Sequence, residues 1–128
     1  MEKLAYLDTH AVIWLHMGEL LLFPQATLKL LAEASLLISP VVLLEMQYLF
    51  EIERLKSGPE KIFKNLEKSL GLKVCGLEFQ KIIMESLKQS WTRDPFDRLI
   101  TAHAVAANAT LVTRDESILK HYPKSFWR

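Results

Sequence analysis

Four carboxylates lie in otherwise hydrophobic surroundings and are widely separated along the chain: Asp8, Glu45, Asp97 and Asp115. An unpaired carboxylate in apolar surroundings is costly unless it is protonated, paired or bound to a cation. Several such acids brought together therefore favour a metal site. Mg2+ prefers oxygen ligands, usually one or two carboxylates with water and phosphate oxygens completing its octahedron. The chemistry that this arrangement suits is hydrolysis of a phosphodiester bond.

Asp8 and Asp115 each follow a short hydrophobic run that is typical of a buried strand. Residues 3–7 precede Asp8, and residues 110–113 come just before Asp115. Because ligands of open α/β sheets bind beyond the carboxyl ends of the strands, we expect the two acids at one sheet edge. Each also has a simpler interpretation: Asp8 as a polar turn residue, and Asp115 as the N-cap of a short helix.

Glu45 is the most anomalous of the four acids. We expect it in the second turn of a helix that begins with Ser39 as N-cap and Pro40 at the first helical position. Its neighbours three and four positions away are all apolar or aromatic, so the carboxylate projects from a hydrophobic stripe. The alternative is an ordinary glutamate at the edge of that stripe whose carboxylate reaches water.

The segment 93–98, Arg-Asp-Pro-Phe-Asp-Arg, contains two acids, either of which could be a ligand. It is typical of a helix start, with Asp94 as N-cap, Pro95 at the first position and Asp97 in the first turn, where the helix dipole favours an acid. Asp97 also continues into a helix face of small and apolar residues. Capping and metal ligation are compatible, so the choice between Asp94 and Asp97 stays open.

Three arginines, Arg93, Arg98 and Arg114, each neighbour one of these acids in the sequence. A guanidinium group can hold a phosphate bidentately, which would place these residues at the rim of a substrate pocket. The alternative is an ion pair that restrains the neighbouring acid. Both interpretations stay open.

The histidines and the common catalytic motifs do not indicate a second site. The spacings of His10, His16 and His103 place none of them on a common helical face with another histidine or with Asp97, so we expect ordinary surface or core residues. The sequence contains no HExxH, no pair of CxxC motifs and no GxxxxGK[ST] phosphate loop. Functions as a zinc protease or a nucleotidase therefore lack support.

Length and composition suit a single domain over residues 1–128. A hydrophobic content of 50% with 24% charged residues is typical of a chain that folds. The lone Cys75 cannot form an internal disulfide or a thiolate metal site, so we expect a small core residue and a reducing compartment. The longest apolar stretch, residues 34–44, is too short to span a membrane, and the N-terminus lacks the pattern of a secretion signal. We therefore expect a cytoplasmic protein with no membrane association.

Hydrophobic periodicity predicts strands that alternate with helices. The predicted strands cover residues 3–7, 36–38, 72–74 and 110–113, with a further edge strand within 122–127. The predicted helices cover residues 11–17, 24–34, 40–56, 60–69, 77–89, 94–108 and 115–119, the first with Thr9 as its N-cap. This alternation is typical of the α/β class, with a mainly parallel sheet covered on both faces by helices. Tyr48, Phe50 and Phe63 exceed what packing on one side of the 40–69 region needs, which indicates a partner surface.

Four ordered motifs along the chain resemble those of the PIN domain, most closely the VapC-type toxins. They are the opening Leu-Asp-Thr-His at 7–10, the segment from Ile38 through Glu45, the Arg-Asp-Pro-Phe-Asp-Arg run at 93–98, and the ending Leu-Val-Thr-Arg-Asp at 111–115. The resemblance implies an α/β/α sandwich and cleavage of single-stranded regions of RNA, dependent on Mg2+ or Mn2+. It also implies an antitoxin partner that occludes the site, and a homodimer.

The resemblance also implies roles for individual residues. Asp8, Glu45, Asp97 and Asp115 match the family's acidic quartet, Thr9 and Thr113 match hydroxyls close to it, and Asp94 matches a cap or outer contact. In the expected hydrolysis, Asp8 and Asp97 hold the metal ion and Glu45 orients or deprotonates the attacking water. Asp115 would bind a second ion or an outer water, and Thr113 would steady a water on the metal. The products would carry a 5′-phosphate and a 3′-hydroxyl.

Two other functions stay open at this point. The first is a catalytically inactive PIN-like module that binds RNA or an antitoxin, although the presence of all four acids argues against it. The second is a phosphohydrolase that acts on small molecules, which would turn over nucleotides in preference to RNA. The RNA target, tRNA or rRNA in our expectation, and the number of metal ions cannot be predicted from these motifs.

Overall fold

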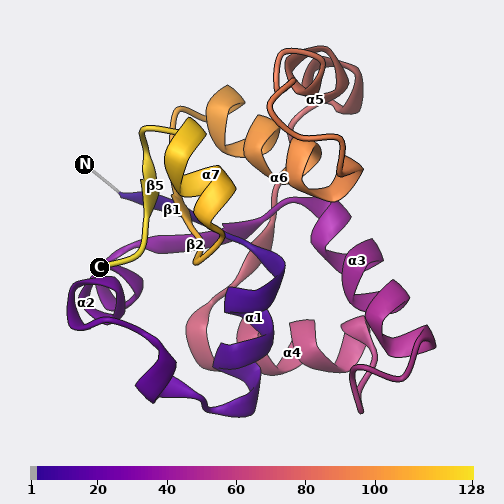
Figure 1. Ribbon diagram of the computed structural model, residues 1–128. Helices are drawn as coiled ribbons and strands as arrows, with labels where there is room; N and C mark the ends of the chain where they lie inside the picture. The colour runs from indigo at the N-terminus through magenta and orange to yellow at the C-terminus, as the bar shows by residue number, and fades with distance from the viewer. Residues whose placement is uncertain (1–2) are drawn as a thin grey trace.

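A five-stranded parallel sheet forms the centre of the computed structural model, which describes residues 3–128 (Figure 1). The strand order is β3-β2-β1-β4-β5, and every neighbouring pair is parallel. The bounds are β1 Leu4–Leu7, β2 Ser35–Ile38, β3 Lys73–Val74, β4 Thr110–Val112 and β5 Ser125–Phe126. The predicted α/β class and the predicted edge strand near the C-terminus are confirmed. Residues 1 and 2 of the expected domain lie outside the described residues.

Helices cover both faces of this sheet. They are α1 Thr9–Met17, the 3-10 helix η1 Leu20–Leu22, α2 Gln25–Glu33, α3 Pro40–Glu51, α4 Pro59–Leu70, α5 Phe79–Ser86, α6 Pro95–Ala106 and α7 Glu116–His121. Figure 1 shows α1, α2 and α4 below the sheet and α6 and α7 above it, with α5 beyond α6. Helix α3 packs against both α4 and α6. The three-layer α/β/α sandwich is therefore confirmed.

Several helix boundaries differ from the prediction, as in α5, predicted over residues 77–89, and two of the differences have a clear local cause. Helix α1 is capped by Asp8 rather than Thr9, because the Asp8 side chain accepts a hydrogen bond from the Thr9 backbone N–H. Helix α3 ends at Glu51 rather than near residue 56, since Glu53 adopts a left-handed conformation (φ 63°) and the Arg54 N–H returns to the Leu49 carbonyl. Glycine usually occupies this position of a helix end, so a glutamate gives no signal in the sequence.

The central strand β1 and its neighbour β4 are deeply buried in the core. Ala5 and Leu7 of β1 and Leu111 and Val112 of β4 have no exposed surface. A parallel strand that is covered on both faces needs a nearly continuous hydrophobic run. Both strands could therefore be predicted from the sequence. No helix among residues 3–128 combines the length and the apolar character that crossing a membrane requires.

Cys75 is a buried core residue, as predicted, with 7% of its surface exposed. The Tyr6 hydroxyl donates a hydrogen bond of 2.8 Å to its Sγ. Burial, together with this contact, raises the pKa of Tyr6 well above its ordinary value. The bond ties the central strand β1 to the loop that follows the edge strand β3.

Candidate active site

The carboxyl edge of the sheet brings three of the four predicted acids together. Asp8 directly follows the central strand β1, and its backbone N–H donates to the Val112 carbonyl of β4 at 3.0 Å. Glu45 comes from the second turn of α3, which follows β2, and Asp115 follows β4. The order of strand connections reverses between β1 and β4, so the acids stand at the switch point where open α/β sheets bind ligands.

These three acids line a cavity of about 430 Å3, together with Asp97 of α6 and the α6 cap Asp94. Its lining consists of Asp8, His10, Trp14, Glu45, Asp94, Asp97, Arg114 and Asp115. Asp97 reaches the cavity because α6 packs against α3, which carries Glu45. The structure therefore brings together all four acids of the predicted quartet, as well as Asp94.

Asp8 is the most buried of these acids, with 8% of its surface exposed. Its Oδ1 accepts a hydrogen bond of 2.7 Å from the Thr9 N–H, and its Oδ2 accepts one of 2.6 Å from the Thr113 hydroxyl. Burial raises the pKa of Asp8, while the two hydrogen bonds and the charge of His10 oppose this rise. The carboxylate is thus held in one orientation in a dry environment.

The two predicted threonines contact the acids directly. The Thr9 hydroxyl donates a hydrogen bond of 2.5 Å to Glu45 Oε1. The Thr113 hydroxyl donates to Asp8 and also accepts a hydrogen bond of 3.0 Å from the Asp115 N–H. Both threonines are fully buried. The Thr9 hydroxyl links α1 to Glu45 of α3, and the Thr113 hydroxyl links the end of β4 to Asp8.

Helix capping accounts for three of the acids around the cavity. Asp8 caps α1, Asp94 caps α6 and Asp115 caps α7. Asp94 Oδ1 accepts from the N–H groups of Phe96 and Asp97, at 2.8 Å and 3.2 Å. Asp115 Oδ1 accepts from the Ile118 N–H at 2.9 Å. The capping interpretation is correct for these residues. All three caps also line the cavity, because each lies in a loop that leads into a helix at this edge of the sheet.

Asp97 experiences the combined charge of the whole cluster. Its pKa is raised to about 7, first by burial and then by repulsion from Asp94, Asp8, Asp115 and Glu45. The pKa of Glu45 is raised as well, mainly by burial, although its hydrogen bond from Thr9 lowers it. Repulsion of this kind is what a bound cation relieves.

The donor set fits a hard divalent cation. Five carboxylates face one cavity, and oxygen donors are the ligands that Mg2+ and Mn2+ prefer. Within residues 3–128, no group of three or more His, Cys, Asp or Glu side chains is already arranged to hold a metal ion. The residues therefore match such an ion in their chemistry and would have to draw closer to bind it.

Two residues at this cavity were missed by the sequence analysis. His10 and Trp14 both line it, although the prediction treated His10 as an ordinary surface or core residue. They lie four residues apart on α1, two and six positions after the cap Asp8, so their spacing could have placed them on one helix face near that acid.

The three arginines have different surroundings. Arg114 lines the cavity, and its guanidinium carbon lies 5.8 Å from the centre of the Trp14 ring. Arg98 Nε instead donates a hydrogen bond of 2.8 Å to the Thr92 carbonyl, which braces the loop before α6. Arg93 is exposed and is absent from the cavity lining. Only Arg114 is placed to meet a ligand of the acids.

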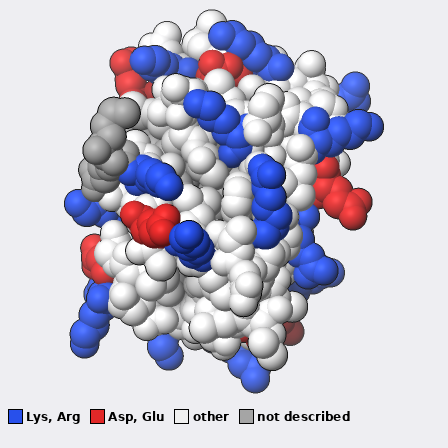
Figure 2. Space-filling view, turned by 90° about the vertical axis from the view of Figure 1, so that its left-hand side faces the viewer, with Lys and Arg blue, Asp and Glu red and all other residues white. Residues whose placement is uncertain are grey.

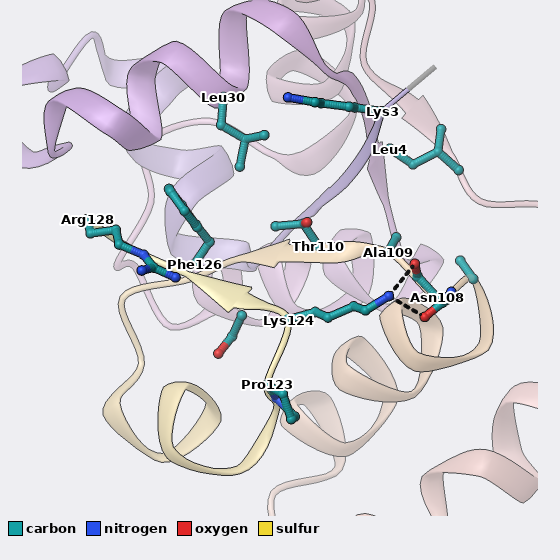
Figure 3. Close-up of a pocket in the computed structure, with 12 residues that line it drawn as sticks. Lys3, Leu4, Leu30, Asn108, Ala109, Thr110, Pro123, Lys124, Phe126 and Arg128 are labelled. Atoms are coloured by element: carbon teal, nitrogen blue, oxygen red, sulfur yellow. Dashed lines mark hydrogen bonds between the residues drawn. The ribbon is translucent and has the colours of Figure 1, made fainter. Parts of the chain in front are cut away.

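A second, larger hollow of about 580 Å3 lies at the opposite, amino edge of the sheet. Figure 2 shows the face of the molecule that carries α2, β5 and the chain ends, where Lys and Arg side chains are widespread. In the close-up, Lys3, Lys124 and Arg128 surround the hollow (Figure 3). Lys124 Nζ is held there by the Asn108 side chain at 2.5 Å. Among residues 3–128, no acid contributes to the lining, so the described part of this hollow lacks the chemistry of the carboxyl edge.

Removal of the Thr113 hydroxyl provides a test of how the site is held. We expect Thr113→Val to lower the free energy of unfolding by about 1–3 kcal/mol, because it removes a donor to buried Asp8 and an acceptor for the Asp115 N–H. The measurement is urea denaturation in EDTA.

The matched control is Thr101→Val. The Thr101 side chain is also fully buried, but its hydroxyl has no hydrogen-bond partner among residues 3–128. Its replacement should therefore leave the stability unchanged or raise it. Equal losses of stability in the two variants would contradict the proposed contribution of the Thr113 hydrogen bonds.

Comparison with known proteins agrees with this architecture. The model of a family described as the PIN domain matches residues 5–124 of the chain. No curated protein has a sequence similar enough to count as a relative.

Several solved structures share the fold. A chain of VapBC2 from Rickettsia felis, bound to a DNA fragment from their promoter, matches with a TM-score of 0.63 and 22% identity, over 98% of this chain and 99% of that one. VapBC-1 from nontypeable Haemophilus influenzae matches with a TM-score of 0.65 and 19% identity, over 98% and 96%. A toxin-antitoxin complex from Klebsiella pneumoniae matches with a TM-score of 0.61 and 19% identity, over 95% of each chain. At these identities the likeness establishes the fold alone.

Proposed function

Because this chain belongs to the PIN domain family, whose members are generally nucleases, we propose that it is a metal-dependent endoribonuclease. In this proposal, residues 1–128 form a single domain that acts as the toxin of a toxin–antitoxin pair of the VapBC type. The observation that carries the proposal is the convergence of Asp8, Glu45, Asp97 and Asp115 on one cavity, where burial and then the charges of the neighbouring acids raise the pKa of Asp97 to about 7.

The proposed reaction is hydrolysis of an RNA phosphodiester by in-line attack of water. Asp8 and Asp97 would hold Mg2+ or Mn2+, which when bound supplies positive charge to the phosphate and lowers the pKa of water. Asp115 would position an outer water or a second ion, and Arg114 would contact the phosphate at the rim. The bond between phosphorus and the 3′-oxygen breaks, and that oxygen takes a proton from solvent, which leaves a 3′-hydroxyl and a 5′-phosphate.

Glu45 would take the proton from the attacking water. Its carboxylate is half-buried and is oriented by the Thr9 hydroxyl, which donates to Oε1 and leaves Oε2 for the water. Burial raises the pKa of Glu45, which makes it a better proton acceptor than an exposed glutamate. Asp97 is the stronger candidate for direct metal contact because it is partly buried among the other acids, whereas Asp94 is exposed and its Oδ1 accepts two backbone hydrogen bonds.

The deciding experiment is incubation of the purified protein with bulk tRNA and rRNA in Mg2+, in Mn2+ and in EDTA. We expect cleavage with either ion, complete loss in EDTA and recovery when the ion is restored in excess. End labelling should detect a 5′-phosphate at each cut. Absence of cleavage with every divalent ion would favour the non-catalytic binding module. Faster turnover of free nucleotides than of RNA would favour the small-molecule phosphohydrolase.

Exposed apolar side chains support the protein partners in this proposal. Leu21 is fully exposed at η1, and Phe79 of α5 is 68% exposed. A cavity of about 290 Å3 lies between α3, α5 and α6, with Leu44 and Phe79 in its lining. Such surface on an isolated chain is typical of interaction sites. The structural neighbours are chains of VapBC and toxin-antitoxin complexes, so we propose an antitoxin and a second copy of this chain as the partners.

The partners can be tested by light scattering coupled to size-exclusion chromatography. A protein encoded next to this chain should co-purify with it and suppress RNA cleavage, and the chain alone should elute with twice its monomer mass. The proposal also places the protein in the cytoplasm, where tRNA and rRNA occur and where the single buried Cys75 stays reduced.

A further inference from the structure

Trp14 lies beside the acids but has no part in the hydrolysis proposed above. It lines the same cavity as Asp8 and His10. The rings of Trp14 and His10 have centres 5.8 Å apart and are tilted by 47°. Trp14 is six residues beyond Asp8, which is about 9 Å along a helix that rises 1.5 Å per residue. A nucleotide whose phosphate lies at the acids can therefore reach this indole with its base.

Other aromatic rings hold Trp14 in place. Phe23, which is buried, meets the Trp14 ring edge-on at 6.3 Å. Trp127, next to the edge strand β5, lies 5.9 Å from Trp14 and 4.9 Å from Phe23. A side chain fixed in this way loses little conformational freedom when a ligand binds. Trp14 itself is only half-buried, so part of its surface is available in the cavity.

Arg114 lies over the Trp14 ring. Its guanidinium carbon lies 5.8 Å from the indole centre, and the residue as a whole is exposed. A cation–π contact at an exposed position is weak. The arginine can therefore leave the ring when a larger flat group arrives, and its charge then becomes available for a phosphate.

We propose that Trp14 is a stacking platform for a nucleobase adjacent to the scissile phosphate, and that Arg114 moves from the indole to the RNA backbone when the base binds. The inference rests on the proposed nuclease function and identifies part of its substrate: a single-stranded segment with an unstacked base. Stacking on an aromatic ring suits such a segment because every base has a π-face. It adds affinity without requiring a particular sequence.

The test uses RNA in which one base at a time is removed. The protein carries Glu45→Gln, which keeps an oxygen acceptor for Thr9 and stops cleavage. The RNA is a short single strand containing a cleavage site mapped with the unmodified protein, and affinity is measured by fluorescence anisotropy in Mg2+. We expect an abasic nucleotide at one position next to the cut site to weaken binding about tenfold, the usual effect of losing one base–aromatic stack.

Protein variants then link this loss to Trp14. Adding Trp14→Leu should weaken binding of intact RNA by the same factor and abolish the difference between intact and abasic RNA. Trp14→Phe, with a smaller ring, should retain a reduced difference. The matched control is Trp91→Leu: Trp91 stacks on His121 with centres 5.0 Å apart and does not line the cavity. This control should preserve the full difference.

Salt dependence separates the role of Arg114 from that of Trp14. Arg114→Gln should lower the slope of the logarithm of affinity against the logarithm of salt by about 0.7, the value for one phosphate contact on single-stranded RNA. Trp14→Leu should leave this slope unchanged. Unequal folding among the variants is detected by circular dichroism and thermal melting before binding is compared.

Three results would overturn the platform. They are an abasic penalty that persists in Trp14→Leu, a penalty in Trp14→Phe equal to that of the tryptophan protein, and the absence of any sensitive position in the Glu45→Gln protein. The second result decides the matter even where Trp14→Leu does not fold. A protein that neither cleaves RNA nor, as Glu45→Gln, binds it would instead overturn the nuclease function itself, and the platform with it.

Discussion

Replacing Asp8 with asparagine should lower RNA cleavage by about 100- to 1,000-fold, the effect of removing one preorganised charge from an active site. The fold should survive the change. Asparagine keeps an oxygen that can accept the Thr9 N–H, and its amide nitrogen can donate to the Thr113 hydroxyl in place of the hydrogen bond that Oδ2 accepted. It also removes a buried carboxylate whose pKa is raised by burial. We therefore expect the stability in EDTA to be no lower than that of the original protein. Cleavage is measured on labelled RNA at saturating Mg2+, and stability by urea denaturation.

Glu116→Gln is the matched control for the loss of an acid at this edge of the sheet. Glu116 lies in the first turn of α7, next to Asp115, but is exposed and absent from the cavity lining. Its loss should change the cleavage rate by less than about twofold. Metal-dependent cleavage that survives Asp8→Asn at an undiminished rate would eliminate Asp8 as a metal ligand.

The stability of the metal-free protein should fall as the pH rises from about 5 to 7.5, because the pKa values of Asp97, Asp8 and Glu45 are all raised in the folded state. Asp97 should account for a measurable part of this loss. The folded-state pKa of Asp97 is about 7, against 3.8 for the model group, so the folded protein retains a proton in this range that the unfolded chain has released. Stability decreases wherever the folded state binds more protons. Because Asp97 is partly exposed, we discount the full effect for solvent screening to about 1–2 kcal/mol.

Asp97→Asn isolates this contribution. His103 acts in the opposite direction, because burial lowers its pKa and the folded protein then gains stability as the pH rises through the ordinary range of histidine. Both proteins contain His103, so the difference between their urea denaturation curves, recorded in EDTA at each pH, reports on Asp97. Identical pH profiles for the two proteins would contradict the charge coupling in the cavity.

Added metal should restore the stability that is lost at high pH in the unmodified protein, but not in Asp97→Asn. Metal binding needs deprotonated carboxylates, so Mg2+ should stabilise the protein strongly at pH 7.5 and little at pH 5. At a concentration 100 times the dissociation constant, the gain is about 2.7 kcal/mol. Asp97→Asn should show a much smaller gain at the same concentration. The absence of stabilisation by any divalent ion at pH 7.5 would contradict the proposed metal site independently of RNA cleavage.

The sheet and its acidic edge could be predicted because both follow from local patterns. Asp8 and Asp115 end hydrophobic runs of the kind that buried parallel strands require, and parallel strands have their carboxyl ends at one edge. The Ser39 and Asp94 caps, each followed by proline, marked their helix starts correctly. These signals need no knowledge of how the helices dock.

The composition of the cavity could not be predicted in the same way. Asp97 reaches it only because α6 packs against α3, which depends on the tertiary arrangement of two helices. Trp14 lies within the predicted helix 11–17, but its place in the lining depends on contacts with Phe23 and Trp127, which lie outside that helix. The early end of α3 depends on the left-handed backbone conformation of Glu53. The sequence gives no sign of it, because this conformation is usually marked by glycine.

The hydrogen bond between Thr113 and Asp8 joins residues that are 105 positions apart. During synthesis, the N-terminal end of a chain leaves the ribosome first, so this contact cannot form until residue 113 has emerged. Parallel pairing of β1 with β4 must likewise wait until β4 has left the ribosome. Under the proposed function, a nascent chain would therefore lack an assembled site until residue 113 has left the ribosome, and the ribosome that is making the toxin would be protected from it up to that point.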